Sequence, residues 1–205
     1  MPEEMTSQDL KERLALIETM IAEGRKQTQS WGWTFLLWGI AYYVAIFWAA
    51  WGQPLTIVGQ NYIAWPITMI TAIAVTVAIA VRRTPQPGTK IGRALGSLWS
   101  CMGISLFLLS AALGSSGRIE AHTFVAIVAA FLGFANGASG TILRWKAQIA
   151  SAVVWWITSV LACFVSLSQL TTVFLAAIFL CQIVFGIYAM TLDARRSRPT
   201  GEVHA

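Results

Sequence analysis

Six long apolar runs, separated by short polar connections, dominate the pattern of hydrophobic and polar positions along the chain. They lie at about Trp33–Trp51, Tyr62–Val81, Ala94–Leu113, Phe124–Arg144, Ile149–Leu167 and Thr171–Leu192. Each run has about 20 residues, which is the length that an α-helix needs to cross roughly 30 Å of hydrocarbon. The pattern therefore predicts an all-α, polytopic membrane protein, with a bundle of six transmembrane helices over residues 31–192.

The polar segment 1–30 predicts one further helix, which lies outside the membrane. Four apolar residues recur there at intervals of four, three and four, and form one candidate partner stripe: Leu10, Leu14, Ile17 and Ile21. This spacing is typical of an amphipathic helix. Acidic residues outnumber Lys11 and Arg13 up to residue 23, so anionic lipid would repel this part. It is also short for a self-supporting coiled coil. We expect it to pack on the protein's own basic loops or on a protein partner, with a solvated helix as the alternative.

Composition and charge support the membrane prediction and add an orientation. Of the 205 residues, 57% are apolar and 11% are charged, as in integral membrane proteins. The net charge of +5 lies in short connections, which favours a role in topology over nucleic-acid binding. Of the 14 basic residues, only Arg118 falls on the less basic side of the predicted alternation. The positive-inside rule therefore places both termini in the cytoplasm, including a disordered tail at 193–205.

The apolar runs contain few groups that could perform chemistry. No ionisable residue lies in the interior of a predicted span, which counts against proton relays, ion-coupled transporters and membrane proteases. No catalytic or nucleotide-binding motif occurs. The three cysteines have no close pair and are expected to be reduced: Cys101, Cys163 and Cys181. The start of the chain lacks the order of a signal peptide, so the first run is expected to direct insertion. We predict neither an enzyme nor a metal or cofactor site.

Small residues and side-chain amides define a candidate region for helix contact or for a polar pathway: Asn136, Gln182, Gly96, Gly133 and Gly137. An Asn or Gln within a membrane most often makes a hydrogen bond between helices, and ligand contact is the alternative. Glycines spaced by four residues allow two helices to approach closely. Since Gly96 and Gly137 lie at a similar predicted depth, we expect the third and fourth spans to cross near these two residues.

A charged cluster is predicted on the less basic side, at the start of the fourth span: Arg118, Glu120 and His122. The Glu120 and His122 side chains could bind a metal or move a proton. However, no second His or Cys is available on that side to complete a zinc site. We therefore expect Glu120 to stabilise the helix N-terminus and to pair with Arg118.

Several of these features resemble a group of small bacterial membrane proteins whose activity is uncharacterised. The shared features are a Gly-rich helix end at Gly137–Leu143, a basic turn at Arg144–Lys146, Trp155 or Trp156, Gln169, Leu170, Gly186, Tyr188, and the segment Gly32–Ile40 after an acidic helix. The resemblance covers about half of the chain. It implies a six-helix protein of the bacterial inner membrane and leaves open a cytoplasmic regulator as a companion. It supplies no catalytic residue.

Two functions follow as expectations. The first is a non-enzymatic sensor or interaction protein whose N-terminal helix contacts a cytoplasmic protein. The alternative is a small oligomeric transporter or channel, with a weakly polar pathway near Asn136 and Gln182. The expected partners are the lipid bilayer, a cytoplasmic protein and further copies of the chain, and nucleic acid is not among them.

Overall fold

The computed structural model describes residues 7–51, 64–83, 89–118 and 120–196, and these residues are helical with short turns. The elements are α1 (Ser7–Ser30), α2 (Gly32–Trp51), α3 (Ala64–Arg82), α4 (Lys90–Ser115), α5 (Ala121–Ile142), α6 (Lys146–Leu161), α7 (Leu167–Ile178), the π-helical turn η2 (Phe179–Val184) and α8 (Phe185–Arg196). The predicted all-α fold is confirmed for this part of the chain.

In the described part of the chain, five helical segments have the length and the apolar composition needed to cross a membrane. They are α2, α3, α4, α5 and the continuous run of α7, η2 and α8, which extends over 30 residues from Leu167 to Arg196. The remaining apolar helix, α6, has 16 residues. At 1.5 Å per residue it is about 24 Å long, which is shorter than a typical hydrocarbon core.

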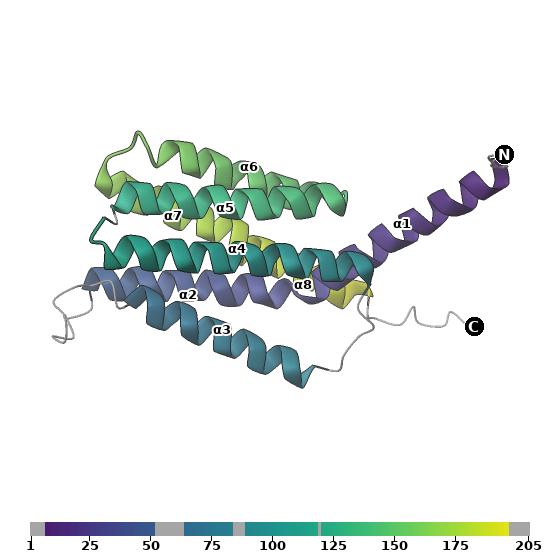
Figure 1. Ribbon diagram of the computed structural model, residues 1–205, viewed down its shortest axis with the longest axis horizontal. Helices are drawn as coiled ribbons and strands as arrows, with labels where there is room; N and C mark the ends of the chain where they lie inside the picture. The colour runs from purple at the N-terminus through teal and green to yellow at the C-terminus, as the bar shows by residue number, and fades with distance from the viewer. Residues whose placement is uncertain (1–6, 52–63, 84–88, 119, 197–205) are drawn as a thin grey trace, which may run out of the picture.

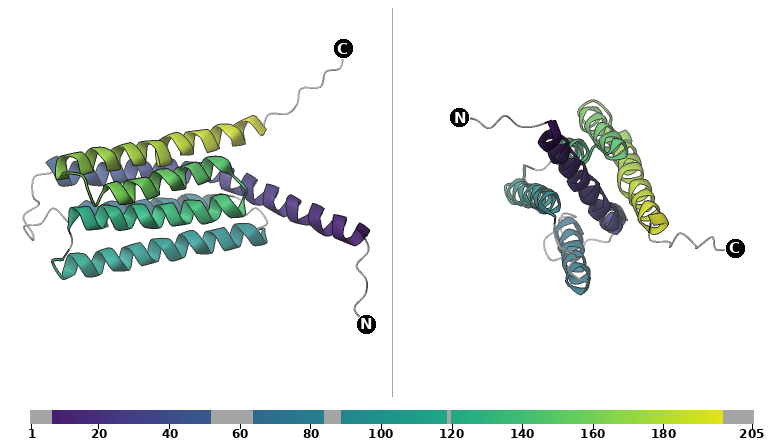
Figure 2. Two further views of the ribbon diagram at one scale, coloured as in Figure 1. Left: turned by 90° about the horizontal axis from the view of Figure 1, so that it is seen from above. Right: turned by 90° about the vertical axis from the view of Figure 1, so that its right-hand side faces the viewer.

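The helices of the bundle lie lengthwise beside one another, and α1 begins at the same end at which α8 finishes (Figure 1). This end, here called the basic end, carries exposed basic residues: Lys26, Arg82, Lys90 and Arg144. The other end, here called the far end, holds Arg118 and Glu120. The first half of α1 projects past the basic end, away from the other helices, as the left view of Figure 2 shows.

Of the five candidate spans among the described residues, helix α5 is the most buried, and it packs closely along α6. Ten of its residues are buried, from Val125 to Gly140. Gly133 and Gly137 face the Trp156 ring of α6, and a Cβ on Gly140 would lie 2.9 Å from the Ile149 backbone nitrogen. The glycines therefore form a notch that receives α6.

The third and fourth predicted spans, α4 and α5, do meet near Gly96 and Gly137, where the Trp99 indole nitrogen donates to the Ser139 hydroxyl at 3.1 Å, but the expected contact through the two glycines is wrong. Nothing lies within 4 Å of a Cβ built on Gly96, whereas one on Gly137 would lie 2.9 Å from the Trp156 ring. Depth along the helix axis was the basis of that prediction. Depth does not specify in which direction around the helix a residue points, and Gly137 points towards α6.

A second close crossing joins α2 to the last helical run. A Cβ on Gly186 would lie 3.0 Å from the Leu36 nitrogen and 3.1 Å from the Gly32 oxygen. Further along α2 towards the far end, a Cβ on Gly39 would lie 2.8 Å from Gln182 Cβ. Two backbones can approach this closely only where small residues face them. This contact fixes η2 against α2.

Several predicted boundaries change. The fifth run was predicted to end at Leu167, but α6 ends at Leu161 and Leu167 begins α7. The predicted basic connection reached Arg93, but α4 already begins at Lys90, where the Thr89 hydroxyl accepts a hydrogen bond from the Gly92 nitrogen. The predicted disordered tail began at residue 193, but α8 continues to Arg196. The rest of that tail, and residues 1–6 of the N-terminal segment, lie outside the described residues.

Candidate functional site

Four side-chain amides are buried in the described part of the chain: Gln29 near the end of α1, and three others on three elements of the bundle. Asn136 of α5 and Gln148 of α6 are 0% exposed, and Gln182 of η2 is 2% exposed. Several of their polar atoms have no hydrogen-bond partner among the described residues: Asn136 Oδ1, Gln148 Oε1, Gln148 Nε2 and Gln182 Oε1. Native proteins pair the large majority of such buried groups. These amides are therefore the strongest candidate for a functional site.

The helix–helix contacts bring the three amides to neighbouring levels. The Cys181 thiol, next to Gln182, donates a hydrogen bond to the Ser151 carbonyl at 3.5 Å. Ser151 follows Gln148 by one turn on the same buried face of α6. On the other side, a Cβ on Gly137 would lie 3.5 Å from Ala152 Cβ, which places Asn136 level with Ser151. We call Asn136, Gln148, Ser151 and Gln182 the amide layer.

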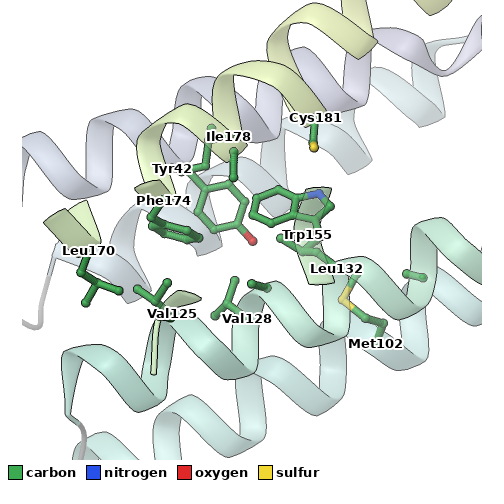
Figure 3. Packing of buried hydrophobic residues seen from close by; sticks show 14 residues of the cluster. Tyr42, Met102, Val125, Val128, Leu132, Trp155, Leu170, Phe174, Ile178 and Cys181 are labelled. Carbon is green, nitrogen blue, oxygen red and sulfur yellow. The ribbon is translucent and has the colours of Figure 1, made fainter. Parts of the chain in front are cut away.

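The amide layer lies between two apolar clusters. Towards the basic end the cluster consists of Phe35, Leu95, Leu143, Trp145, Phe185 and Ala189. Towards the far end the larger cluster includes Tyr42, Leu132, Trp155 and Phe174, whose side chains meet in the interior (Figure 3). The Trp155 ring packs on Phe174 with a centroid distance of 6.2 Å, and its Nε1 is buried without a partner in the described part of the chain. Polar groups are thus enclosed by aromatic and aliphatic side chains on both sides.

The structure brings together some of the predicted polar residues and adds one that was missed. Asn136 and Gln182 approach the same level, but the Asn136 amide donates to Leu132 O of its own helix at 2.9 Å, and not to a neighbouring helix as expected. Gly96 is not part of this region. Gln148 was missed because it follows a basic turn and was assigned to a connection. The recurrence of Gln148, Ser151, Trp155 and Thr158 at helical spacing is the signal that identifies it.

At the far end the charged cluster is arranged differently from the prediction. The structure places Glu120 beside His122, with 3.9 Å between Oε1 and Nδ1, and records no ion pair with Arg118 among the described residues. His122 Nε2 lies 3.2 Å from the Val165 carbonyl oxygen. Glu120 is the N-cap residue of α5 but makes no side-chain capping bond. Within the described residues, no group of three potential metal ligands occurs here or elsewhere.

The N-terminal helix divides into an exposed arm and an anchored root. In the arm, residues 7–23, Leu10, Leu14 and Ile17 of the predicted partner stripe are each about half exposed, at 49%, 53% and 51%. Ile21, the last stripe residue, is partly covered. The stripe is therefore a surface that no described part of this chain covers along most of its length.

The root, residues 24–30, is held by polar contacts to three separate elements. The Arg25 guanidinium donates hydrogen bonds to the carbonyl oxygens of Leu143 and Arg144 at 2.8 and 3.0 Å. The Thr89 hydroxyl donates to Gln27 Oε1 at 3.1 Å. Arg83 donates to the Ser30 carbonyl at 3.0 Å. The root therefore fixes the direction in which the arm leaves the bundle.

No protein family, no curated protein and no solved structure matches the chain. Fold alone does not specify function, so the function is inferred from the chemistry of these residues.

Proposed function

We propose that this chain is an integral membrane protein with six membrane-crossing helices and that it acts as a non-enzymatic interaction protein through its N-terminal arm. Five described segments have the length and composition of membrane spans, and α6 is the shorter sixth. The basic end faces the cytoplasm under the positive-inside rule, which places the arm there as well. A bacterial inner membrane is the setting that the resemblance to small bacterial proteins supports.

The exposed stripe on a fixed arm carries this proposal. Leu10, Leu14 and Ile17 lie on one face of a helix that projects beyond the bundle (Figure 1), so lipid around the spans does not cover them. The arm and the root form one continuous helix, Ser7–Ser30, so the arm can fold back on the basic loops only if this helix breaks. A protein partner would bury the stripe, and the alternative is a helix that stays solvated.

The charges of the arm specify what kind of partner fits. Four acidic residues lie in it beside two basic ones, so its net charge is −2: Asp9, Glu12, Glu18 and Glu23 against Lys11 and Arg13. A helix of 17 residues is about 25 Å long and offers about four turns of contact. We therefore propose an amphipathic helix with an apolar face and basic flanks as the partner, bound as one helix beside another.

Site-specific photo-crosslinking in cells tests this proposal. A photoreactive amino acid is placed at Leu14 or Ile17 on the stripe, and at Thr19 on the opposite face as the matched control. We expect both stripe positions to crosslink to one protein, and Thr19 to give no such product. A peptide from that protein should bind the full-length chain, with an affinity that falls as salt rises.

The charge variant Leu14→Glu with Ile17→Glu should abolish the crosslink while the protein remains in the membrane, because it places charges in the apolar contact. If stripe and control positions crosslink alike, or only to lipid, the interaction proposal is wrong.

The buried amides favour a second candidate function, which is the binding of a small polar solute. A transporter or channel needs polar groups that continue from one face to the other. Here Asn136, Gln148 and Gln182 lie between two apolar clusters, so their arrangement supports a closed binding site more directly than an open pathway. Solute flux into proteoliposomes, measured against empty liposomes, distinguishes the two.

A further inference from the structure

The amide layer contains more hydrogen-bonding groups than the described protein satisfies. The unpaired acceptors are three amide oxygens, on Asn136, Gln148 and Gln182, and the unpaired donor is Gln148 Nε2. Trp155 Nε1, in the adjoining cluster towards the far end, is a further unpaired donor. All four residues are at least 98% buried. A buried polar group without a partner is strongly unfavourable in a protein interior, and more so within a bilayer. Such a set is expected to have a binding partner.

The backbone gives a second and independent indication of a site at this level. The last helical run changes from α-helical to π-helical hydrogen bonding over Phe179–Val184, where Gln182 lies. A single π-helical turn within an α-helix occurs frequently at functional sites, because it displaces side chains from the regular spacing. Here the turn is fixed on one side by Gly39 of α2 and on the other by Ser151 of α6.

The chemistry of these groups selects the kind of ligand. No carboxylate or basic side chain belongs to the amide layer, so no charged group would compensate the charge of a bound ion. A cation could pair only with the three amide oxygens and would leave the donors unpaired, whereas an anion could pair only with the donors and would leave the oxygens unpaired. A neutral molecule that both donates and accepts hydrogen bonds can satisfy both kinds of group.

We propose that the amide layer is a closed binding site for a small uncharged hydrogen-bonding molecule, held between Asn136, Gln148 and Gln182. The occupant is either a dissolved organic solute of about the size of acetamide, or water. This inference deepens the second candidate function and is independent of the arm. Its failure would leave the crosslinking result of the arm unchanged.

Thermal unfolding of the full chain in lipid nanodiscs tests the solute. Acetamide and glycerol are the probes, and sodium and potassium chloride are the ionic controls. We expect one neutral probe to raise the melting temperature in a saturable way, by on the order of 5 °C at about 100 times its Kd. The salts should not reproduce this rise. Gln148→Met and Gln182→Met should each abolish it, and Thr76→Val, a polar-to-apolar change in α3 outside the layer, should leave it intact.

Water as the occupant is tested in the absence of probe. Protein labelled with ¹⁵N-glutamine is examined by NMR for magnetisation transfer between water and the side-chain NH₂ protons of Gln148 and Gln182. Each signal is assigned by its loss in the corresponding Met variant. Transfer to both side chains, together with a lower melting temperature of each Met variant, supports a water-filled site.

Two results would overturn the proposal. One is the absence of a probe-dependent shift and of transfer from water, with Gln148→Met raising the melting temperature, because removal of an unsatisfied group then stabilises the protein. The other is direct pairing of the amides. In that case Gln148→Met and Gln182→Met would be coupled in a double-mutant cycle, with neither probe nor water in contact.

Discussion

Helices α4 and α5 have the same mean hydropathy over their most apolar 18 residues. Yet 6% of these residues are buried in α4 and 56% in α5. Apolar character thus makes both helices candidate spans but does not say which one occupies the centre of the bundle. The difference lies in what faces their small residues. The glycines of α5 receive side chains of α6, whereas a Cβ on Gly96 or Gly103 of α4 would meet nothing within 4 Å. A glycine stripe therefore has structural consequences only where another helix is shaped to enter it.

The largest effect on stability is expected from a substitution that fills the glycine notch of α5. In Gly140→Leu the new side chain must enter space held by the backbone of α6, since a Cβ there already lies 2.9 Å from the Ile149 nitrogen. Overpacking of this kind costs about 3 kcal/mol. The free energy of unfolding, from SDS titration in mixed micelles, measures it.

The matched control is Gly103→Leu in α4, where the side chain would extend into open space. It should change the free energy of unfolding by no more than about 0.5 kcal/mol. Equal losses at both positions would mean that the two helices are packed alike, contrary to the comparison.

The second effect on stability concerns the basic end of α5, where Arg25 in the root of α1 forms hydrogen bonds with the carbonyl groups that follow the helix. Arg25 donates to Leu143 O and Arg144 O, which belong to the turn that ends α5. Hydrogen bonds from a charged donor contribute about 1.5 to 3 kcal/mol, and the partial exposure of this contact favours the lower value. We expect Arg25→Met to destabilise the protein by about 1.5 kcal/mol.

The adjacent Lys26 is exposed and supplies the control for charge. Lys26→Met removes the same charge without a described contact, and should change the free energy of unfolding by less than about 0.5 kcal/mol. If Arg25→Met and Lys26→Met changed the free energy of unfolding equally, the hydrogen bonds from Arg25 would not contribute to stability.

The sequence is sufficient to predict the helices and to place their basic connections at one end, because both depend on local composition. The positions of Arg82, Lys90 and Arg144 at one end of the described bundle agree with the predicted alternation. Helix partners could not be predicted in this way. They depend on which side of each helix points inward, and this is decided by contacts between distant residues, such as Gly137 with Trp156, one of ten tryptophans in the chain.

The same reasoning explains what was predicted of the amide layer. Asn136 and Gln182 stand out because each interrupts an apolar run, so composition alone identifies them. Gln148 does not stand out, since it follows Arg144 and Lys146 and reads as part of a polar turn. The π-helical turn at Gln182 contacts α2 and α6, and it has no signature in the local sequence.

A third effect compares how α4 and α5 end. Both close with the same backbone motif: Arg118 N bonds Leu113 O at 3.0 Å, and Trp145 N bonds Gly140 O at 2.8 Å. The residue with positive φ is Gly117 in α4, at 66°, and Arg144 in α5, at 49°. A left-handed conformation favours glycine over other residues by about 1 kcal/mol.

Arg144→Gly should therefore raise the free energy of unfolding by about 1 kcal/mol, and Gly117→Ala should lower it by a similar amount. Arg144→Ala is the control, because it removes the charge but keeps the unfavourable φ, and it should give no gain. The bonds from Arg25 survive all three changes, since they use backbone carbonyls. A gain in Arg144→Ala as large as that in Arg144→Gly would point to charge instead of backbone strain.

The smallest effect concerns a polar contact between the two helices. The Trp99 indole nitrogen of α4 donates to the Ser139 hydroxyl of α5 at 3.1 Å, and Ser139 is buried. Hydrogen bonds between membrane helices contribute about 0.6 kcal/mol on average. A double-mutant cycle of Ser139→Ala and Trp99→Phe should give a coupling near that value, whereas the exposed Ser100 in place of Ser139 should give none. A coupling of zero for Ser139 would mean that this hydrogen bond does not help to hold α4 on α5, and that apolar contacts do so instead.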